Sequence, residues 1–526
     1  MRDLQDRTAR GFFQSNRALL LAWCVVALYL VLTFVLIEGR QPTWEDELYV
    51  QSTAWSIVHG GPAMLSTISQ YPHRAPLDHF YGPVSFRVAA GLIRIFGLKT
   101  WPWRLVCFLL GITVIVAASA ALLRLTGARG WKLLLAAALL VTSCTYCNVL
   151  PGRWDPMTVG LLLSDIAFLL NAIEQHWVGL FVRSVAAGIC FGLAAGSTPR
   201  SLPALAAALC GIAAAVWLDA RKRKPILVAG IVAAISGFAT DALLLAPLGM
   251  NPWSWLQFVR VTSQGDRVNS SPLFGGQWDL GISSHKLLII LVIIIMMAGV
   301  VSAWEPRRER ADPQKTWRLT LTIIGVVNFA LYALLISRVL SYALFWLPML
   351  IVSAFSWIRL DQIQGPWARR AVASMVILGT LLTVTLEGKR IFDAVRSWKG
   401  SDPAILIDVV REQIPPGSVV FGPIGGYFFP VEQSCSQYLY MQDDILQGLS
   451  YGVDSPEYRT QYIDRFACQR PTFIIWPATD SDEEIPEEVL AHAQRIDGRE
   501  KAQRIDNTII YRIEKPNNCS DTGGSK

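Results

Sequence analysis

The stretch Trp44-Glu45-Asp46-Glu47-Leu48-Tyr49 lies just beyond the first long apolar run of the chain, Ala18 to Ile37. A run of about 20 apolar residues allows one helix to cross the roughly 30 Å hydrocarbon core of a bilayer. The three carboxylates therefore emerge at a membrane surface, where tryptophan and tyrosine are also enriched. A carboxylate there can meet a lipid headgroup that carries a reactive phosphate while it stays hydrated enough to ionise. The alternative is an acidic loop start that only solvates a helix end.

The composition is that of a membrane protein. Of the 526 residues, 52% are hydrophobic and 17% are charged, against about 25% charged residues in soluble domains. Apolar runs of spanning length recur from Ala18 to Leu386. The net charge of +7 comes largely from basic residues in short loops between these runs, which is typical of cytoplasmic loops and not of a nucleic-acid-binding surface.

Hydropathy and loop charge together predict a polytopic α-helical protein with about eleven spans, a cytoplasmic N-terminus and an external C-terminus. The cluster Arg221-Lys222-Arg223-Lys224 marks the cytoplasmic side most clearly. In the first external loop, Glu47–His59 and Gly82–Phe96 are expected to lie along the membrane surface as amphipathic helices, the second closed by Gly97. The predicted spans are residues 18–37, 104–123, 133–150, 157–172, 181–196, 201–218, 225–246, 285–304, 317–336, 340–358 and 371–386.

From Gly388 onward the composition becomes that of an ordinary soluble domain. Its pattern predicts a small α/β domain outside the membrane. The domains are therefore a transmembrane domain at 1–387, an extracytoplasmic α/β domain at 388–516 and a disordered tail at 517–526. The predicted strands are 418–422, 472–476 and 508–513, and the predicted helices are 402–413 and 486–495.

The nine cysteines show no zinc-ligand spacing. Cys144 and Cys147 have C-x-x-C spacing but fall in an apolar run, so they are interpreted as packing residues. Cys435 and Cys468 either form a disulfide, as an oxidising external compartment allows, or remain two free thiols.

Several short motifs follow one another in a characteristic order along residues 15 to 386. They are Asp46-Glu47, Gly82-Pro83, Ile95-Phe96-Gly97, Trp103-Arg104, Trp154-Asp155-Pro156, Gly196-Ser197-Thr198-Pro199-Arg200, Ser337-Arg338-Val339-Leu340-Ser341-Tyr342 and Leu347-Pro348. In order and topological placement they resemble the GT-C membrane glycosyltransferases, especially the branch with protein O-mannosyltransferases and bacterial lipid A aminoarabinose transferases.

This resemblance implies a transferase that takes a sugar from a polyprenyl-phosphate donor. The acidic residue that follows the first span in the family maps to Asp46, with Glu47 beside it. In such enzymes it is the catalytic base for the acceptor hydroxyl, or it helps to hold a divalent metal, Mg or Mn, on the donor phosphate. Because a glycosyl phosphate carries its own leaving group, the protein must place a carboxylate near the acceptor and cations near the phosphate.

Arg200 and Arg338 are candidates for binding the donor phosphate, since both fall at outer helix ends and arginine binds phosphate bidentately. The alternative is that they only extend to the interface. Asp155 is a candidate for positioning the acceptor, or it caps a helix ahead of Pro156. Tyr342 is assigned to the substrate-binding set from its place in the family motif.

The sequence departs from the aminoarabinose transferases at Tyr81-Gly82-Pro83, where those enzymes carry Glu-Lys-Pro. The lysine that would contact phosphate is missing, and Arg74, His79 or Arg87 are candidates to replace it. This difference argues against lipid A and aminoarabinose as substrates, but not against the broader class. His73 and His79 are either metal ligands or hydrogen-bonded structural residues.

The second external loop, residues 248–284, is rich in tryptophan, glycine and serine. Trp255 and Arg267 are candidates for contacting the sugar, because aromatic rings stack on the apolar face of a pyranose. This loop is interpreted as a lid over a cavity, and aromatic anchoring at the interface is the alternative.

The predicted partners are a polyprenyl-phosphate-linked sugar, membrane lipids and a lipid, glycan or protein acceptor, with no nucleic acid. The predicted location is a bacterial inner membrane. Two other classes compete, a secondary transporter and a non-catalytic membrane scaffold. A transporter should show paired halves and charges near the membrane midplane, whereas here the ionisable residues gather at helix ends.

Overall fold

The computed structural model describes the helices and strands of the chain together with some of their connections. The described residues are 19–38, 45–58, 82–97, 99–148, 152–198, 201–248, 253, 297, 314–335, 343–358, 366–397, 414–415, 418–422, 437–440, 473–477, 493–496 and 508–513, with a few side chains left out. They divide into two units. The first comprises Met1–Gly39, Phe80–Val84 and Trp101–Val395, and the second comprises Arg40–His79, Ser85–Thr100 and Arg396–Lys526.

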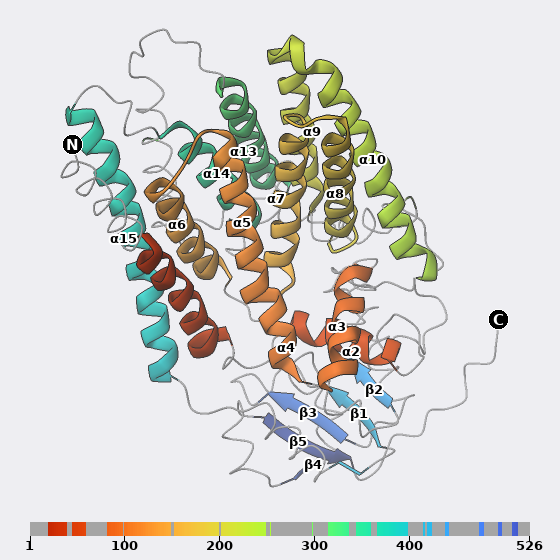
Figure 1. Cartoon of the computed structure of the whole chain (residues 1–526). Helices are drawn as coiled ribbons and strands as arrows, with labels where there is room; N and C mark the ends of the chain where they lie inside the picture. Colours follow the sequence, from red (N-terminus) through yellow and green to blue (C-terminus); the bar gives the residue numbers. More distant parts are fainter. Residues whose placement is uncertain are drawn as a thin grey trace, which may run out of the picture. The chain divides into compact units, whose positions relative to one another are not determined.

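The first unit is a bundle of long apolar helices (Figure 1). The first helix, Leu19–Ile37, ends in a π-helical segment, η1 (Phe34–Glu38). The second, Thr100–Leu125, consists of α4 (Thr100–Arg104), a π-helical segment η2 (Leu105–Leu110) and α5 (Gly111–Leu125). The bundle continues with α6 (Trp131–Cys147), α7 (Asp155–Ala172), α8 (Trp177–Ala195), α9 (Leu202–Leu218), η4 (Ala220–Lys222), α10 (Arg223–Leu245), η5 (Ala246–Leu248), α13 (Lys315–Leu335), α14 (Ala343–Trp357) and α15 (Pro366–Ser397).

Among the described residues, five helices are long and apolar enough to cross a membrane. Three shorter helices, α6, α9 and α14, are also apolar. Each of these eight lies within a few residues of a predicted span, which confirms an integral membrane protein. The five are Leu19–Ile37, Thr100–Leu125, Asp155–Ala172, Trp177–Ala195 and Ala220–Leu245. The predicted span 285–304 falls outside the described residues except for Met297, so the total of about eleven stays a prediction.

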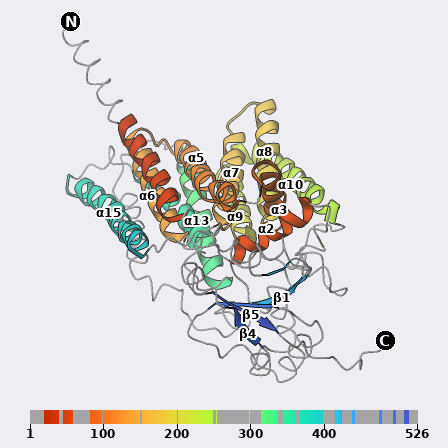
Figure 2. The ribbon, with the colours of Figure 1, turned by 90° about the horizontal axis from the view of Figure 1, so that it is seen from below.

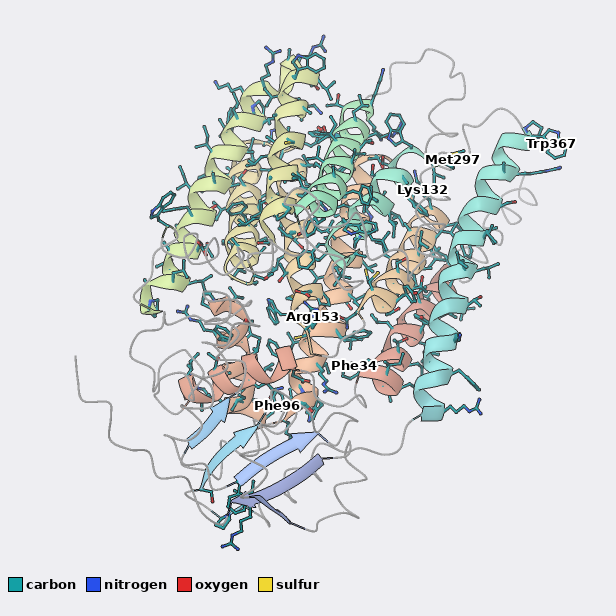
Figure 3. The ribbon with its side chains drawn as sticks, turned by 180° about the vertical axis from the view of Figure 1, so that it is seen from behind. Phe34, Phe96, Lys132, Arg153, Met297 and Trp367 are labelled. Carbon is teal, nitrogen blue, oxygen red and sulfur yellow. The ribbon has the colours of Figure 1, made fainter. Side chains whose placement is uncertain are left out.

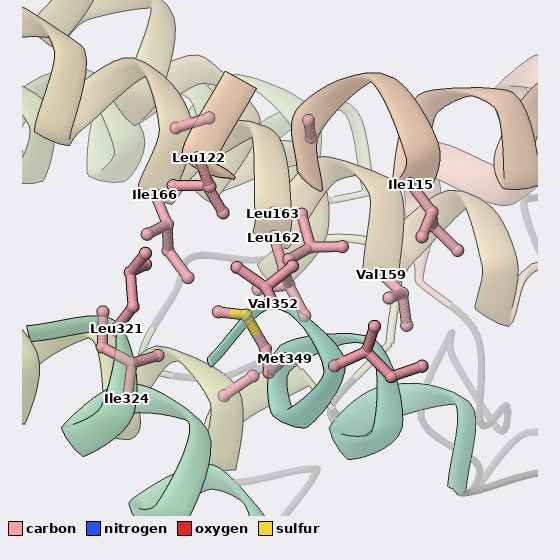
Figure 4. Packing of buried hydrophobic residues seen from close by; sticks show 14 of the residues in the cluster. Ile115, Leu122, Val159, Leu162, Leu163, Ile166, Leu321, Ile324, Met349 and Val352 are labelled. Atoms are coloured by element: carbon pink, nitrogen blue, oxygen red, sulfur yellow. The ribbon is translucent and has the colours of Figure 1, made fainter. Parts of the chain in front are cut away.

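The core of the bundle is filled by branched apolar side chains from α5, α7, α13 and α14 (Figure 4). Other apolar residues point outward instead: Phe181 on α8 and Ile231, Ile235 and Phe238 on α10 are all exposed. A helix that is apolar on both its packed and its outer face is suited to lipid as the surrounding solvent. The first span belongs to the same bundle (Figure 2), since the ring of its Phe34 lies 6.2 Å from that of Phe108.

Helices α8 and α10 pack through glycine. A Cβ at Gly188 would lie 1.9 Å from Oγ of Ser236, and one at Gly192 would lie 2.5 Å from the carbonyl oxygen of Gly237. Small residues let two helix backbones approach closely, which is how helices associate when lipid offers no hydrophobic driving force. This seam fixes the relative height of α8 and α10.

The second unit contains two short helices. The first, α2, runs from Glu45 to Val58, and the second, α3, runs from Pro83 to Phe96, with its first two residues in the first unit. Gly97 ends α3 at φ +71°, and its N–H donates to the carbonyl of Ile93 at 2.9 Å. A glycine in the left-handed region is a common helix terminator, as predicted for this position. At 14 residues each, about 21 Å, both helices are too short to cross a bilayer.

The second unit also contains a five-stranded sheet in the order β2-β1-β3-β5-β4. Strand β1 pairs in parallel with β2 and β3, and β5 pairs antiparallel with β3 and β4. The strands are β1 (Val419–Gly422), β2 (Gln437–Tyr440), β3 (Phe473–Pro477), β4 (Ala493–Ile496) and β5 (Thr508–Ile513).

Strands β1, β3 and β5 lie where strands were predicted, whereas β2 was not predicted. The predicted helix at 486–495 is wrong over its last three residues, because Ala493–Ile496 pair with β5. Residues 486–492, the predicted helix at 402–413, both external cysteines and the tail lie outside the described residues. Cys144 and Cys147 are buried free thiols, as predicted.

Candidate active site

The turns of the bundle bring several sequence motifs to one end of the first unit. Helices α7 and α8 follow each other through the short connection 173–176, so the start of α7 and the end of α8 lie at the same end. We call this the motif end; it contains Trp103-Arg104, Gly152–Asp155 and Gly196–Thr198. Figure 3 shows Phe34 and Arg153 toward this end, and Lys132 and Trp367 toward the other.

Trp103 and Trp154 join two motifs that are distant in sequence. Their rings are stacked with centroids 5.2 Å apart and an interplanar angle of 13°. The indole N–H of Trp103 donates to the carbonyl of Gly152 at 2.8 Å. Gly152 has φ +69°, a conformation that glycine adopts without strain. The turn before α7 is therefore held against the start of the long helix Thr100–Leu125.

A buried ion pair lies in this turn. Nε of Arg153 is 2.9 Å from Oδ2 of Asp155, and the two side chains are 4% and 1% exposed. Asp155 is the first residue of α7, and Trp154 is its N-cap, so the helix-capping alternative does not describe Asp155. A carboxylate in the first helical turn is still stabilised by the helix dipole. The pair gives the motif end a fixed, charged pair of side chains.

The Gly82-Pro83 motif meets the Gly196-Ser197-Thr198 motif directly. The N–H of Gly82 donates to the carbonyl of Ser197 at 2.7 Å, and that of Val84 donates to Gly196 at 3.2 Å. Proline between them has no N–H, so it fits this alternating pattern. The hydroxyl of Ser201 donates to the carbonyl of Thr198 at 2.8 Å. The chain is thus fixed on both sides of Pro199 and Arg200, which lie outside the described residues.

Two carboxylates lie buried within the spans and were not singled out from the sequence. Asp241 of α10 is 7% exposed, and no described residue donates a hydrogen bond to its Oδ1, which would lie 3.2 Å from a Cβ at Gly196. Asp165 is buried in the middle of α7. The expectation that ionisable residues gather at helix ends is therefore wrong for Asp165. An acidic residue inside an apolar run was the available signal.

The acidic motif lies on α2. Glu47 is fully buried, and its Oε1 accepts a hydrogen bond of 3.2 Å from Nε2 of Gln51. Asp46 lies in the same helix, and its side chain is outside the described part. Successive residues of a helix point about 100° apart. Positions 46 and 47 therefore lie on different faces of α2.

Arg87 lies half-buried on α3, and its phosphate-binding role stays a prediction. The other predicted site residues lie outside the described part of the chain and stay predictions. They are Arg74, His79, Arg200, Trp255, Arg267, Arg338 and Tyr342. Within the described residues, no three His, Cys, Asp or Glu side chains are grouped as metal ligands. Because Asp46, His73 and His79 are not among the described side chains, the divalent metal also stays a prediction.

No protein-family model matches this sequence, and no curated protein matches it either. Solved structures do match. ArnT from Cupriavidus metallidurans, bound to undecaprenyl phosphate, is 14% identical with a TM-score of 0.59, and the match covers 95% of this chain and 99% of ArnT. The same protein in the apo state gives 15% identity and a TM-score of 0.53, with coverage of 93% and 97%.

A second protein with a similar structure is the Archaeoglobus fulgidus oligosaccharyltransferase, tethered to an acceptor peptide that contains the NVT sequon. It is 14% identical with a TM-score of 0.55, and the match covers 87% of this chain and 68% of that one. Its apo form gives a TM-score of 0.52. The chain therefore shares the fold of ArnT and of this oligosaccharyltransferase, in agreement with the resemblance drawn from the sequence motifs.

Proposed function

We propose that this protein is a membrane glycosyltransferase that moves a sugar from a polyprenyl-phosphate donor to an acceptor hydroxyl. The observation that carries this proposal is the fold similarity to ArnT in complex with undecaprenyl phosphate, which extends over 95% of this chain and 99% of ArnT. The acceptor is a glycolipid, a cell-envelope glycan or a protein.

The meeting of the motifs supports the same function. Gly82-Pro83, Trp103-Arg104, Trp154-Asp155 and Gly196–Thr198 were singled out separately along the sequence, and their described residues are linked pairwise at the motif end. Fixed positions are what electrostatic catalysis needs, because groups that are already oriented require no reorganisation in the transition state.

The proposed reaction forms one bond and breaks one. The acceptor oxygen bonds to the anomeric carbon of the donor as the bond from that carbon to the phosphate oxygen breaks. Asp46 takes the proton of the acceptor hydroxyl. The leaving polyprenyl phosphate carries the electron pair, and Arg200, Arg338 and Arg74 neutralise its charge. Asp155 positions the acceptor.

The remaining predicted residues are assigned to substrate binding. Trp255, Arg267, Tyr342 and His79 contact the sugar or the headgroup in this proposal. Glu47 supports the acidic motif through its contact with Gln51. A divalent ion, where one is required, would be held by Asp46 and the donor phosphate and would neutralise charge on that phosphate.

The charges at the opposite end of the bundle support an external site. There Glu174 forms an ion pair with Lys222 and accepts a hydrogen bond of 2.9 Å from Nε1 of Trp317. The ammonium group of Lys222 lies 4.7 Å from the centre of the same indole ring. Together with Arg221, Arg223 and Lys224, these residues form a basic end that suits the cytoplasmic surface. The motif end then faces outward, from the inner membrane of a bacterium.

Release of polyprenyl phosphate by the purified full-length protein tests the proposal. The substrates are undecaprenyl phosphate carrying different pentoses and hexoses, with and without Mg²⁺, Mn²⁺ or chelator. Asp46→Asn should lower the rate by about 10²-fold or more, the usual contribution of general acid–base catalysis. Glu45→Gln removes the neighbouring carboxylate of the same helix as a matched control and should stay active. Full activity of Asp46→Asn would exclude this residue as the base.

A secondary transporter is the second candidate, because a buried carboxylate in mid-membrane, such as Asp165, is typical of ion-coupled transport. Asp165→Asn in proteoliposomes separates the two functions. For a transferase it leaves release of polyprenyl phosphate unchanged. For a transporter it abolishes solute uptake driven by an ion gradient.

A further inference from the structure

The connection from α9 to α10 carries four consecutive basic residues, 221–224, at the basic end. These residues do not share the same surroundings. Lys222 turns into the bundle, where it is paired with Glu174 and lies over the ring of Trp317. The side chains of the other three are exposed, and no described carboxylate forms an ion pair with any of them. Three positive charges are therefore available to a partner outside the described residues.

Two of these cations are held at the surface by the neighbouring helices. Nζ of Lys224 lies 5.9 Å from the centre of the Trp177 ring, at the first residue of α8. Nε of Arg223 donates to the carbonyl of Val216 at 3.0 Å, in the last turn of α9. The starts of α8 and α10 and the end of α9 thus meet at one place, with an exposed basic side chain at each contact.

Two exposed tryptophans lie at the same place. Trp177 is 60% exposed, and Trp217, which follows Val216 in α9, is 78% exposed. Tryptophan is enriched at membrane–water interfaces, because its ring contacts acyl chains while its N–H meets the polar headgroups. The two rings therefore mark the level of the lipid headgroups at this end of the bundle.

An exposed apolar row leads away from the basic residues along α10. The row consists of Leu227, Ile231 and Phe238, all of them exposed. Together with Arg223 they fall within about 80° of one another around an ideal helix, and Arg223 heads the row. Helix α8 lies beside α10 and runs in the same direction (Figure 1), and it is likewise exposed at Phe181, one turn inside its start. The exposed charges thus border directly on an apolar surface.

We propose that the basic end binds an anionic phospholipid, with Arg221, Arg223 and Lys224 at its phosphate and the acyl chains along the exposed row of α10. Arginine binds a phosphate through parallel hydrogen bonds, and lysine binds it as a point charge. Basic side chains between the cytoplasmic ends of helices are suited to anionic lipid headgroups. The motif end lies at the other end of the bundle, so this lipid is neither donor nor acceptor. The assignment does not depend on the proposed transferase activity.

The apolar row favours a phospholipid over a soluble anion. Free phosphate or an acidic peptide would use the charges alone and would leave the row uncovered. Leu227 lies one helical turn from Arg223, and a phospholipid likewise passes from its phosphate to its acyl chains over a short distance along the membrane normal. Phosphatidylglycerol, which carries a net negative charge, is the expected ligand. In phosphatidylcholine the lipid's own ammonium group already neutralises the phosphate.

Native mass spectrometry of the full-length protein in detergent measures this binding. The probes are phosphatidylglycerol and phosphatidylcholine with identical acyl chains. The wild type should bind phosphatidylglycerol at least about 10-fold more tightly, and the difference should shrink as salt is added, because exposed charges are screened. Phosphatidylglycerol should also raise the thermal unfolding temperature more than phosphatidylcholine does, since a ligand of the native state stabilises it.

Neutral variants test which residues cause the preference. Arg221→Gln should weaken phosphatidylglycerol binding about 5-fold, and the triple variant Arg221→Gln/Arg223→Gln/Lys224→Gln should bind the two lipids equally. Arg221→Gln keeps the backbone N–H that donates to Oδ1 of Asp219 at 3.1 Å, so the turn should stay folded. Arg124→Gln is the matched control, at an exposed arginine in the last turn of α5 at the same end of the bundle, and should leave the preference unchanged.

Four results would overturn the assignment. Equal binding of the two lipids by the wild type would exclude a selective site. A triple variant that keeps the wild-type preference, or an equal loss in Arg124→Gln, would place the selectivity elsewhere. Displacement of phosphatidylglycerol by inorganic phosphate at a similar concentration would indicate a site for soluble anions. Tighter binding of undecaprenyl phosphate that the triple variant loses would indicate a polyprenyl-lipid site instead.

Discussion

The indole of Trp103 stacks on that of Trp154 and donates a hydrogen bond to Gly152, so residues 49 apart in sequence hold the start of α7 in place. The next residue after this turn is Asp155, whose carboxylate is paired with Arg153. Any substrate role of Asp155 therefore depends on how firmly the two indoles fix the turn.

Trp103→Phe should keep the stacking but lose the hydrogen bond. The expected cost is about 1 kcal/mol in the free energy of unfolding. Trp103→Leu loses the ring contact too and should cost roughly 3 kcal/mol. Thermal unfolding in detergent measures both, with Trp217→Phe at an exposed tryptophan as the control. Equal stability of Trp103→Phe and Trp103→Leu would mean that the stacked ring contributes nothing.

Removing one member of the buried ion pair should be costly. Arg153→Leu or Asp155→Leu alone leaves a buried charge without this partner and should destabilise the protein by about 3–5 kcal/mol, whereas the double variant should lose much less than the sum. Unfolding of the three variants gives the coupling free energy. If Asp155 positions the acceptor, the double variant regains stability but not transfer. Recovery of both would make the pair purely structural.

The glycine seam between α8 and α10 predicts opposite effects for similar changes. Gly188→Ala and Gly192→Ala should each destabilise the bundle by about 1–3 kcal/mol, because the new methyl group meets backbone and side-chain atoms across the seam. Gly230→Ala in α10 has nothing within 4 Å of the new Cβ. It should stabilise by about 0.5–1 kcal/mol, since glycine is unfavourable inside a helix. Similar shifts at Gly192 and Gly230 would contradict the packing.

Reporter fusions test the proposed orientation. Truncation after Arg221 should give fluorescent green fluorescent protein and inactive alkaline phosphatase, because that connection is expected to be cytoplasmic. Truncation after Trp253 should give the reverse, since α10 lies between the two positions. The opposite pattern would invert the topology and place the motif end in the cytoplasm.

The sequence by itself determined the membrane-spanning class and most helix positions. Apolar runs such as those of α8 and α10 set their own limits, because a backbone in lipid must satisfy its hydrogen bonds within the helix. Local backbone conformation was also predictable from the sequence. Gly97 ends α3 because the left-handed conformation is strained for a residue with a Cβ atom but not for glycine. These are properties of residues close together along the chain.

Tertiary structure alone decided which distant residues meet. The contacts of Gly82 with Ser197 and of Trp103 with Trp154 depend on how the helices fold back on one another. Likewise, Ala493–Ile496 form a strand because they pair with β5, although their local sequence pattern predicts a helix. The burial of Glu47 and Gln51 belongs here too, since a sequence shows that a side chain is polar but not that the fold buries it. Long-range pairing depends on loop closure and packing, and neither is encoded in a local pattern.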